Sequence, residues 1–410
     1  MYYTMYFPLD EYHERWARVE AEMVRRGFQH AIVWGRGAGT YEAHGDLLYL
    51  TNFYSVNTGA TFMPSSGMTG TGFAAALLSV GQPPELIIDT NYYSEEFLAT
   101  DRIVYQERQV EYNIPALVAA TLNARVPGER VAMVGESVLP VMYARIVERL
   151  CPGIEFVEQD DLVLAVRLHK SARELDCYRE AGQIATAAMT KQLEAARKPG
   201  TKQTEVAAAG IAELIRLGGV QHAAPVSSGN GDSRLGEDPL TGSARDIEIR
   251  DGDLVRTWLY GPMWQGYWLD PGRTIVAGRS SARQREAISA VNGLVQTMFE
   301  TFRPGTTLSE IATVASTLRD DIGFGTDFEF IPPVAGHGLG LYWEPPNLWA
   351  TTQLLEDSLN KGDEALWEGQ VISVEYFLKV DGVGSIGVEQ NLIVHADGNE
   401  LLTPIDLEWW

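Results

Sequence analysis

The sequence runs Val371-Ile-Ser-Val-Glu-Tyr-Phe-Leu-Lys379, then Asp381-Gly-Val-Gly384, then Ile386-Gly-Val-Glu-Gln-Asn-Leu-Ile-Val394. Two apolar stretches around a Gly-containing turn predict a β-hairpin. Each strand carries one carboxylate, Glu375 or Glu389, in an otherwise apolar run. A buried, unpaired carboxylate is costly, so each needs a partner: a cation, a shared proton or a basic group of a substrate. A structural salt bridge is the alternative interpretation.

Two residues elsewhere have chemistry that matches these carboxylates. His337 lies in the Gly-rich run Val334-Ala-Gly-His-Gly-Leu-Gly-Leu341, whose glycines let backbone or ligand approach the imidazole. Asp270 follows the aromatic stretch Gly266-Tyr-Trp-Leu269. Three carboxylates and a histidine can hold one Mn, Fe, Co or Zn ion. The open alternative is a metal-free site in which the same groups perform acid–base chemistry.

Taken in order, the motifs resemble those of the superfamily that contains creatinase, aminopeptidase P, prolidase and methionine aminopeptidase. The resemblance spans about residues 165 to 405, with a weaker match before them. Its motifs are Val166-Arg-Leu-His-Lys-Ser171, Glu174-Leu-Asp-Cys-Tyr-Arg-Glu-Ala-Gly182, Gly252-Asp-Leu-Val255, Gly266-Tyr-Trp-Leu-Asp-Pro-Gly-Arg-Thr274, Gly336-His-Gly-Leu-Gly340, Glu344-Pro-Pro346 and Val374-Glu375. It implies an α/β (α+β) protein: a C-terminal pita-bread catalytic domain with an internal pseudo-twofold repeat, and an N-terminal creatinase-like α/β domain.

The expected boundary between the domains is near Val166, which gives domains at residues 1–165 and 166–410. Helical spacing over residues 12–26 is followed by short apolar runs, a pattern typical of α/β folds. The runs predicted as buried strands are residues 31–34, 47–50, 73–78, 86–88 and 131–134. After the boundary, residues 172–197 predict a long amphipathic helix that ends at Lys198-Pro-Gly200.

A repeat supports the two-half interpretation of the catalytic domain. Lys198-Pro-Gly-Thr201 with Glu205 recurs as Arg303-Pro-Gly-Thr306 with Glu310, each between two helical patterns. Ordinary turn chemistry is the alternative explanation for Pro-Gly-Thr, but the flanking patterns repeat as well. Two such halves would join their strands into one curved sheet, with the site on its concave face.

The resemblance also implies ligands for a pair of divalent ions: two Asp, one His and two Glu. Four positions match, namely Asp270, His337, Glu375 and Glu389. The first Asp is missing, because the expected strand at residues 254–260 has no carboxylate and Trp258, Leu259 or Tyr260 takes its place. None of these is a hard-metal ligand. We therefore expect a degenerate centre with either no ion or one.

Two further departures concern the surroundings of the site. Metallo-members carry a histidine before Glu-Pro-Pro, where this sequence has Trp343, and many place an arginine near Gly387. Creatinase has its catalytic histidine on a loop that here spans residues 228–239 and places Glu237 or Asp238 near that position. A carboxylate such as Glu237 can act as a general base if neighbouring acids raise its pKa. Plain turn chemistry is the alternative.

Aromatic residues are concentrated around the predicted site. If residues 264–270 form a regular strand, alternation places Trp264 and Trp268 on the face of Asp270. Trp258, Tyr260 and Trp343 stand where ligands are lost. Tryptophan faces attract desolvated organic cations by about 0.5 to 2 kcal/mol each. We expect a small cationic or zwitterionic substrate. The alternative is that these aromatic rings only fill the volume left by the missing metal and its ligands.

The leading hypothesis is a creatinase-like hydrolase, or lyase, acting on a C–N bond or onium group without a dinuclear metal centre. His337 would transfer the proton, Glu375 and Glu389 would bind the cationic group, and Asp270 would complete the acidic wall. Ectoine hydrolases and dimethylsulfoniopropionate lyases mark the range of chemistry that the resemblance admits. One alternative is a mononuclear metal-dependent Xaa-Pro aminopeptidase or dipeptidase, and another is a non-catalytic binding homologue.

The amino-acid composition limits the possible binding partners of the protein. A net charge of −23 with no basic cluster argues against nucleic acid. No apolar run reaches membrane-spanning length and no signal-peptide pattern is present, so we expect no membrane partner and a cytoplasmic location. Cys151 and Cys177 are the only cysteines, which fits a reducing compartment. The resemblance implies a homodimer whose N-terminal domain closes the partner's site, with Tyr54 as a candidate contact.

Overall fold

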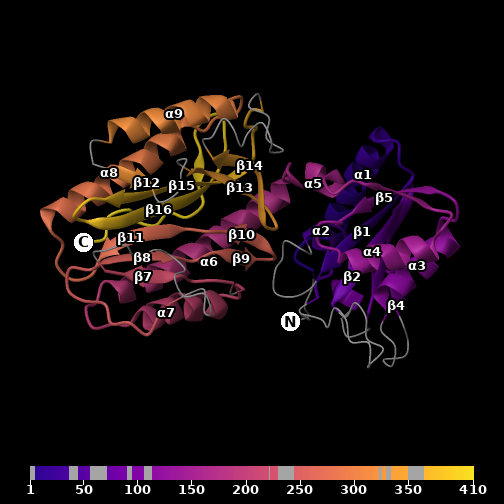
Figure 1. The fold of residues 1–410 in the computed structure, drawn as a ribbon, viewed down its shortest axis with the longest axis horizontal. Helices are drawn as coiled ribbons and strands as arrows, with labels where there is room; N and C mark the ends of the chain where they lie inside the picture. The colour runs from indigo at the N-terminus through magenta and orange to yellow at the C-terminus, as the bar shows by residue number, and fades with distance from the viewer. Residues whose placement is uncertain are drawn as a thin grey trace. The chain divides into compact units, whose positions relative to one another are not determined.

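A computed structural model describes residues 5–36, 45–55, 72–89, 95–105, 113–220, 222–229, 244–322, 326–328, 334–349 and 364–410. The chain divides into two compact units, Met1–His169 and Lys170–Trp410 (Figure 1). The mixed α/β class predicted from the sequence is confirmed. Within the described ranges, no helix combines the length and hydropathy needed to cross a bilayer.

The first unit is built on a six-stranded sheet in the order β4-β3-β2-β1-β5-β6. Its strands are β1 His30–Arg36, β2 Phe73–Ser79, β3 Gln82–Ile88, β4 Ile103–Tyr105, β5 Arg130–Val134 and β6 Glu155–Glu158. Its helices are α1 Leu9–Arg25, α2 Gly45–Thr51, η2 Glu95–Phe97, α3 Ile114–Arg125, α4 Val141–Leu150 and α5 Leu162–Arg167. Apolar residues of α3 and α4 pack with the sheet in one buried cluster. The predicted strands at 31–34, 73–78, 86–88 and 131–134 are confirmed.

The predicted strand at residues 47–50 is wrong, because these residues lie in helix α2. A four-residue apolar run does not distinguish a buried strand from a buried helical turn. The hydroxyl of Thr51 donates to the Leu47 carbonyl one turn earlier, at 2.7 Å, a contact typical of Thr in a helix.

The second unit contains two equivalent helix pairs, one in each half: α6 Ala172–Ala196 with α7 Gln203–Arg216, and α8 Ala282–Thr301 with α9 Leu308–Asp321. Both Pro-Gly-Thr loops make the same contacts. Gly200 N–H donates to the Ile249 carbonyl at 2.8 Å, and Gly305 N–H donates to the Leu366 carbonyl at 2.7 Å. Glu205 and Glu310 each cap the helix that follows their loop. The predicted repeat is confirmed.

Strands of both halves form one sheet with the path β14-β13-β15-β16-β11-β8-β7, to which β12 adds beside β15 and β17 beside β16. The strands are β7 Val226–Ser228, β8 Leu254–Trp258, β11 Gly272–Val276, β12 Thr326–Phe328, β13 Val334–Leu339, β14 Trp343–Trp349, β15 Val371–Val380, β16 Gly384–Ile393 and β17 Glu400–Leu401. The predicted hairpin is β15–β16. The halves meet where β11 pairs with β16, at Gly272 and Glu389.

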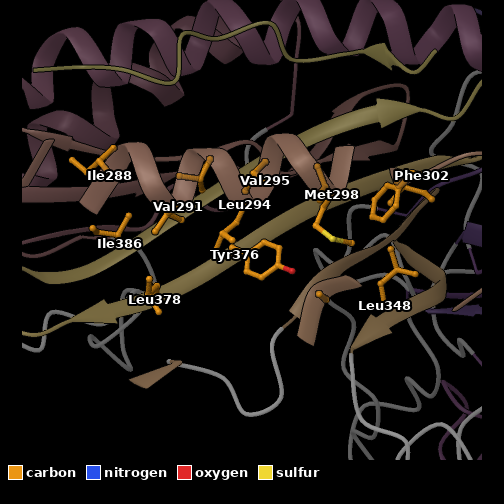
Figure 2. Packing of buried hydrophobic residues seen from close by; sticks show 14 of the residues in the cluster. Ile288, Val291, Leu294, Val295, Met298, Phe302, Leu348, Tyr376, Leu378 and Ile386 are labelled. Atoms are coloured by element: carbon orange, nitrogen blue, oxygen red, sulfur yellow. The ribbon is translucent and has the colours of Figure 1, made fainter. Parts of the chain in front are cut away.

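Helix α8 fixes the position of this hairpin. Ile288, Val291, Leu294, Val295 and Met298 lie along one side of α8 and pack over β15 and β16 (Figure 2). Fully burying one such side chain contributes about 1.5–3 kcal/mol. Because the helix holds the apolar face of the hairpin, the alternate positions are left to point at the opposite face.

The assumption of a regular strand over residues 264–270 is wrong. The chain instead forms a small hairpin of β9, Gly261–Trp264, and β10, Tyr267–Leu269. Gln265 and Gly266 make its turn with φ of 52° and 88°. Alternation counted from Asp270 therefore stops at the turn and says nothing about Trp264.

Candidate active site

The strand register assembles the site as a row across the sheet. His337 on β13 is opposite Ser373 on β15, and Glu375 on β15 is opposite Glu389 on β16. Across the seam, Glu389 pairs with Gly272 on β11, which in turn is opposite Trp258 on β8. Five neighbouring strands thus bring together residues separated by more than a hundred positions in the sequence.

His337 lies at the centre of the acidic cluster. Its Nε2 is 3.2 Å from Asp270 Oδ2, 3.7 Å from Glu389 Oε1 and 4.0 Å from Glu375 Oε1. The side chains of Asp270 and Glu389 are each 3% exposed, against 11% for His337 and Glu375. Of the ion pairs in the described structure, none joins a Lys or Arg to these three carboxylates.

Both oxygens of the Glu389 carboxylate accept hydrogen bonds. The Trp258 indole Nε1–H donates to Oε2, and the Ser373 hydroxyl donates to Oε1. The main chain of Glu389 is also held, because buried Arg273 donates from its guanidinium to the Glu389 carbonyl at 2.6 Å. This residue is therefore fixed in backbone and side chain.

Asn391 orients Asp270 in a reciprocal pair. The Asn391 amide donates to Asp270 Oδ1 at 2.7 Å, and the Asp270 backbone N–H donates to the Asn391 side-chain oxygen at 3.2 Å. Asp270 Oδ2 is thereby left facing His337.

The four groups have divergent pKa values. Burial opposes a charged imidazole, but Asp270 and then Glu375 outweigh it and raise the pKa of His337 to about 9. Burial raises the pKa of Asp270, but charge and hydrogen bonding from His337 reverse the effect and lower it below its usual value. Burial, partly offset by His337, raises the pKa of Glu375 to about 7. Burial and then the neighbouring carboxylates raise the pKa of Glu389 well above its usual range.

This donor set fits one divalent ion. One ligand atom from each of Asp270, His337 and Glu389 lies within 4.8 Å of the others. Bonds of about 2.1 Å in a tetrahedral or octahedral shell separate neighbouring ligand atoms by about 3.0–3.4 Å. His337 Nε2 lies 3.2 Å from Asp270 and 3.7 Å from Glu389, so only small side-chain movements would bring the three ligand atoms to these separations. A cation would also offset the like charges that the strand pairing places together.

An aromatic wall lies beside the cluster. Successive ring contacts join His337 to Trp343 at 5.1 Å, Trp343 to Tyr342 at 5.6 Å, Tyr342 to Trp268 at 5.0 Å, and Trp268 to His222 at 4.8 Å between centroids. Trp343 is 48% exposed whereas Trp268 is 1% exposed, so the wall runs from the interior to the surface.

The sequence profile of metallopeptidase family M24 matches residues 176–396, more than half of the chain. The chain belongs to this family. It is a hydrolase with the pita-bread fold, as the sequence motifs predicted. The chain is 28% identical over 275 residues to an Xaa-Pro dipeptidase of Pyrococcus horikoshii, covering 67% of this chain and 73% of that protein.

Two further comparisons show proteins that this M24 chain resembles. It is 29% identical over 247 residues to a probable dipeptidase PepE of Mycobacterium tuberculosis, covering 60% and 61% of the two chains. The solved Xaa-Pro dipeptidase from Bacillus anthracis superposes with a TM-score of 0.74 at 23% identity, over 97% of this chain and 100% of that one. The latter likeness concerns the fold, and it extends over both units.

The remaining residues that were predicted to belong to the site of this M24 chain are distributed over several segments. Tyr260 lies near Asp270, and burial together with that carboxylate raises the pKa of its hydroxyl. Trp264 packs against Gly218, just after α7. Tyr54 belongs to the first unit, in the segment after α2. Glu237 and Asp238 lie outside the described residues.

Three neighbours of the site were not anticipated. Ser373 lies two residues before Glu375, and Asn391 lies two residues after Glu389, so the period of two in the predicted hairpin places them on the same face. That signal was available in the sequence. His222 reaches the aromatic wall only because residue 223 bridges to Tyr260, a pairing with no sequence signature.

Proposed function

We propose that this M24 hydrolase cleaves an amide-type C–N bond of a small substrate at a site that holds one divalent ion. The convergence of Asp270, His337, Glu375 and Glu389 carries the proposal, because the three buried carboxylates have only the His337 imidazole as an ion-pair partner among the described residues, and a divalent ion would offset their remaining charge. The similarity to proteins named Xaa-Pro dipeptidase supports a dipeptide with a C-terminal proline as the substrate class.

In this mechanism Asp270, His337 and Glu389 would hold the ion, which would supply Lewis-acid chemistry when bound. Glu375, whose pKa is about 7 in the metal-free protein, takes a proton from the attacking water and returns it to the leaving nitrogen. Asn391 keeps one oxygen of Asp270 turned toward the cluster. Trp343 forms the exposed side of the substrate pocket.

The test is hydrolysis of Xaa-Pro dipeptides by chelator-treated protein, with and without added Mn²⁺. We expect Mn²⁺ to restore activity, and His337→Ala to lower it by a factor of at least about 10². His395→Ala is the matched control, because His395 pairs with Glu368 away from the cluster. Full activity after chelation, or unchanged turnover in His337→Ala, would contradict the proposal.

A creatinase-like, metal-free reaction on a cationic substrate is the second candidate. The observation that favours it is the aromatic wall beside the acids, since Trp343 and Tyr342 offer π faces next to carboxylates. Chelated protein should then turn over creatine, ectoine, a betaine or a sulfonium compound. Binding of such a compound should also weaken in Trp343→Ala. Turnover that depends on added metal would exclude this route.

We also propose that the chain forms a homodimer and that Tyr54 contacts the partner's site. The basis is the resemblance to creatinase-like proteins. Light scattering coupled to size-exclusion chromatography measures the mass directly. A monomer at assay concentration would remove Tyr54 from the catalytic site.

A further inference from the structure

Trp258 hydrogen-bonds to a different oxygen of Glu389 from the one nearest His337. Its indole N–H donates to Glu389 Oε2, whereas His337 lies on the side of Oε1 at 3.7 Å. Trp258 is 3% exposed.

The indole ring also fills the space around that oxygen. A Cβ added to Gly272 would lie 1.9 Å from the ring, and one added to Gly387 would lie 2.6 Å from it. On the remaining side the ring stacks on Phe377, with centroids 5.2 Å apart and planes 20° apart. Two glycines and one aromatic face thus form a slot that matches the ring.

We infer that Trp258 limits the centre to a single ion, by covering Glu389 Oε2 with an N–H donor and by filling the space that a second ion would need. Two-metal sites place their ions about 3.5–4 Å apart, and each ion needs its own oxygen donors. The indole N–H occupies the Glu389 oxygen that a second ion would bind, and the ring fills the volume on this side. Trp258 is thus a positioning residue, since it acts through Glu389. The inference rests on the proposed one-ion site.

Trp258 then accounts for two departures from the family motifs, namely the missing first Asp and the missing arginine near Gly387. The ring takes the place where a side chain at position 387 would begin, so glycine is required there. Of Trp258, Leu259 and Tyr260, Trp258 is the one whose side chain hydrogen-bonds to a member of the cluster in the described structure. A large side chain at 258 and the absence of one at 387 are therefore a matched pair.

The test is Mn²⁺ stoichiometry by equilibrium dialysis and elemental analysis, on wild-type protein and Trp258→Asp. The variant frees the volume and adds a carboxylate beside Glu389, so we expect one equivalent in the wild type and two in the variant. Trp34→Phe is the control, because Trp34 is an equally buried indole donor in the first unit, bonded to Met133 Sδ at 3.2 Å. Its stoichiometry should remain one.

The outcomes separate the two proposals. No ion in the wild type would overturn the one-ion mechanism, on which the inference rests, whereas two ions in the wild type would overturn the inference. One ion in both proteins, with the variant folded by circular dichroism, would overturn the inference alone. If the variant does not fold, electron paramagnetic resonance of Mn²⁺-loaded wild type, after unbound Mn²⁺ has been removed, decides. A signal from uncoupled Mn²⁺ supports the inference, and a spin-coupled pair overturns it.

Discussion

Glu375 and Glu389 face each other across β15 and β16, yet they have different environments. Glu389 accepts from Trp258 and Ser373, while Glu375 lies beside His337 at 4.0 Å and has a pKa of about 7. An acid that titrates near neutrality both accepts and donates protons efficiently. The two carboxylates are therefore suited to different tasks, one to holding a ligand and one to proton transfer.

Metal affinity should increase with pH. A divalent ion needs neutral His337 as a ligand and favours ionised Glu375 beside it, and the pKa values of these groups in the metal-free protein are about 9 and about 7. Both groups are protonated at low pH, so uptake must release protons and affinity should rise from pH 6 to 9. Each displaced proton contributes about tenfold per pH unit. Calorimetric Mn²⁺ titrations measure this slope, and Glu375→Gln should reduce it by about one proton near pH 6.

The slot around Trp258 predicts coupled stability effects. Gly387→Ala should lower the free energy of unfolding by about 1–3 kcal/mol, because its Cβ would overlap the indole. The same change should cost less in a Trp258→Leu background, where the overlap with the indole is gone and only the close contact with Phe377, at 2.8 Å, remains. Urea denaturation of the four proteins in this cycle gives the coupling. Gly293→Ala is the control, since nothing lies near that position in α8. Additive effects would contradict the slot.

At the scale of elements, the two Pro-Gly-Thr loops should be energetically equivalent. Gly200 and Gly305 have φ of 88° and 91° and open space around Cα. Alanine at either position should cost about 1 kcal/mol, because the left-handed conformation is unfavourable for a residue with a Cβ. Denaturant unfolding measures both variants. Gly153→Ala, with open space and no positive φ, should change stability by less. Unequal costs at 200 and 305 would show that the halves diverge in their loops.

Elements with strong local patterns were predictable. The β15–β16 hairpin, helix α6 and the repeated loops follow from alternation, helical spacing and turn residues. Four members of the acidic cluster were predictable from the same patterns and the family resemblance. The turn at Gln265, which takes a left-handed conformation without being glycine, has no such signal. Nor does the register that sets Trp258 opposite Gly272, because it depends on pairing between strands separated by a hairpin.

For the whole molecule, a bound ion should raise the unfolding temperature of the second unit. At a free Mn²⁺ concentration of 100 times Kd the stabilisation is about 2.7 kcal/mol, or about 5–10 °C for a unit of this size. Scanning calorimetry with and without Mn²⁺ checks the shift. His337→Ala should lose most of it, whereas the first unit should respond little because the cluster lies entirely within residues 170–410.

In the second unit, the residues that hold the duplicated helix pairs in place are different from those that form the site. The loop hydrogen bonds at Gly200 and Gly305 hold each helix pair to its own half and involve none of the cluster residues. One half presents opposed carboxylates at Glu375 and Glu389, while the other presents a ring opposed to a glycine at Trp258 and Gly272. In a protein built this way, substitutions in one hairpin can change the site without disrupting the helix pairs and loops that support it. New activities can then arise from a few substitutions along the seam between β11 and β16.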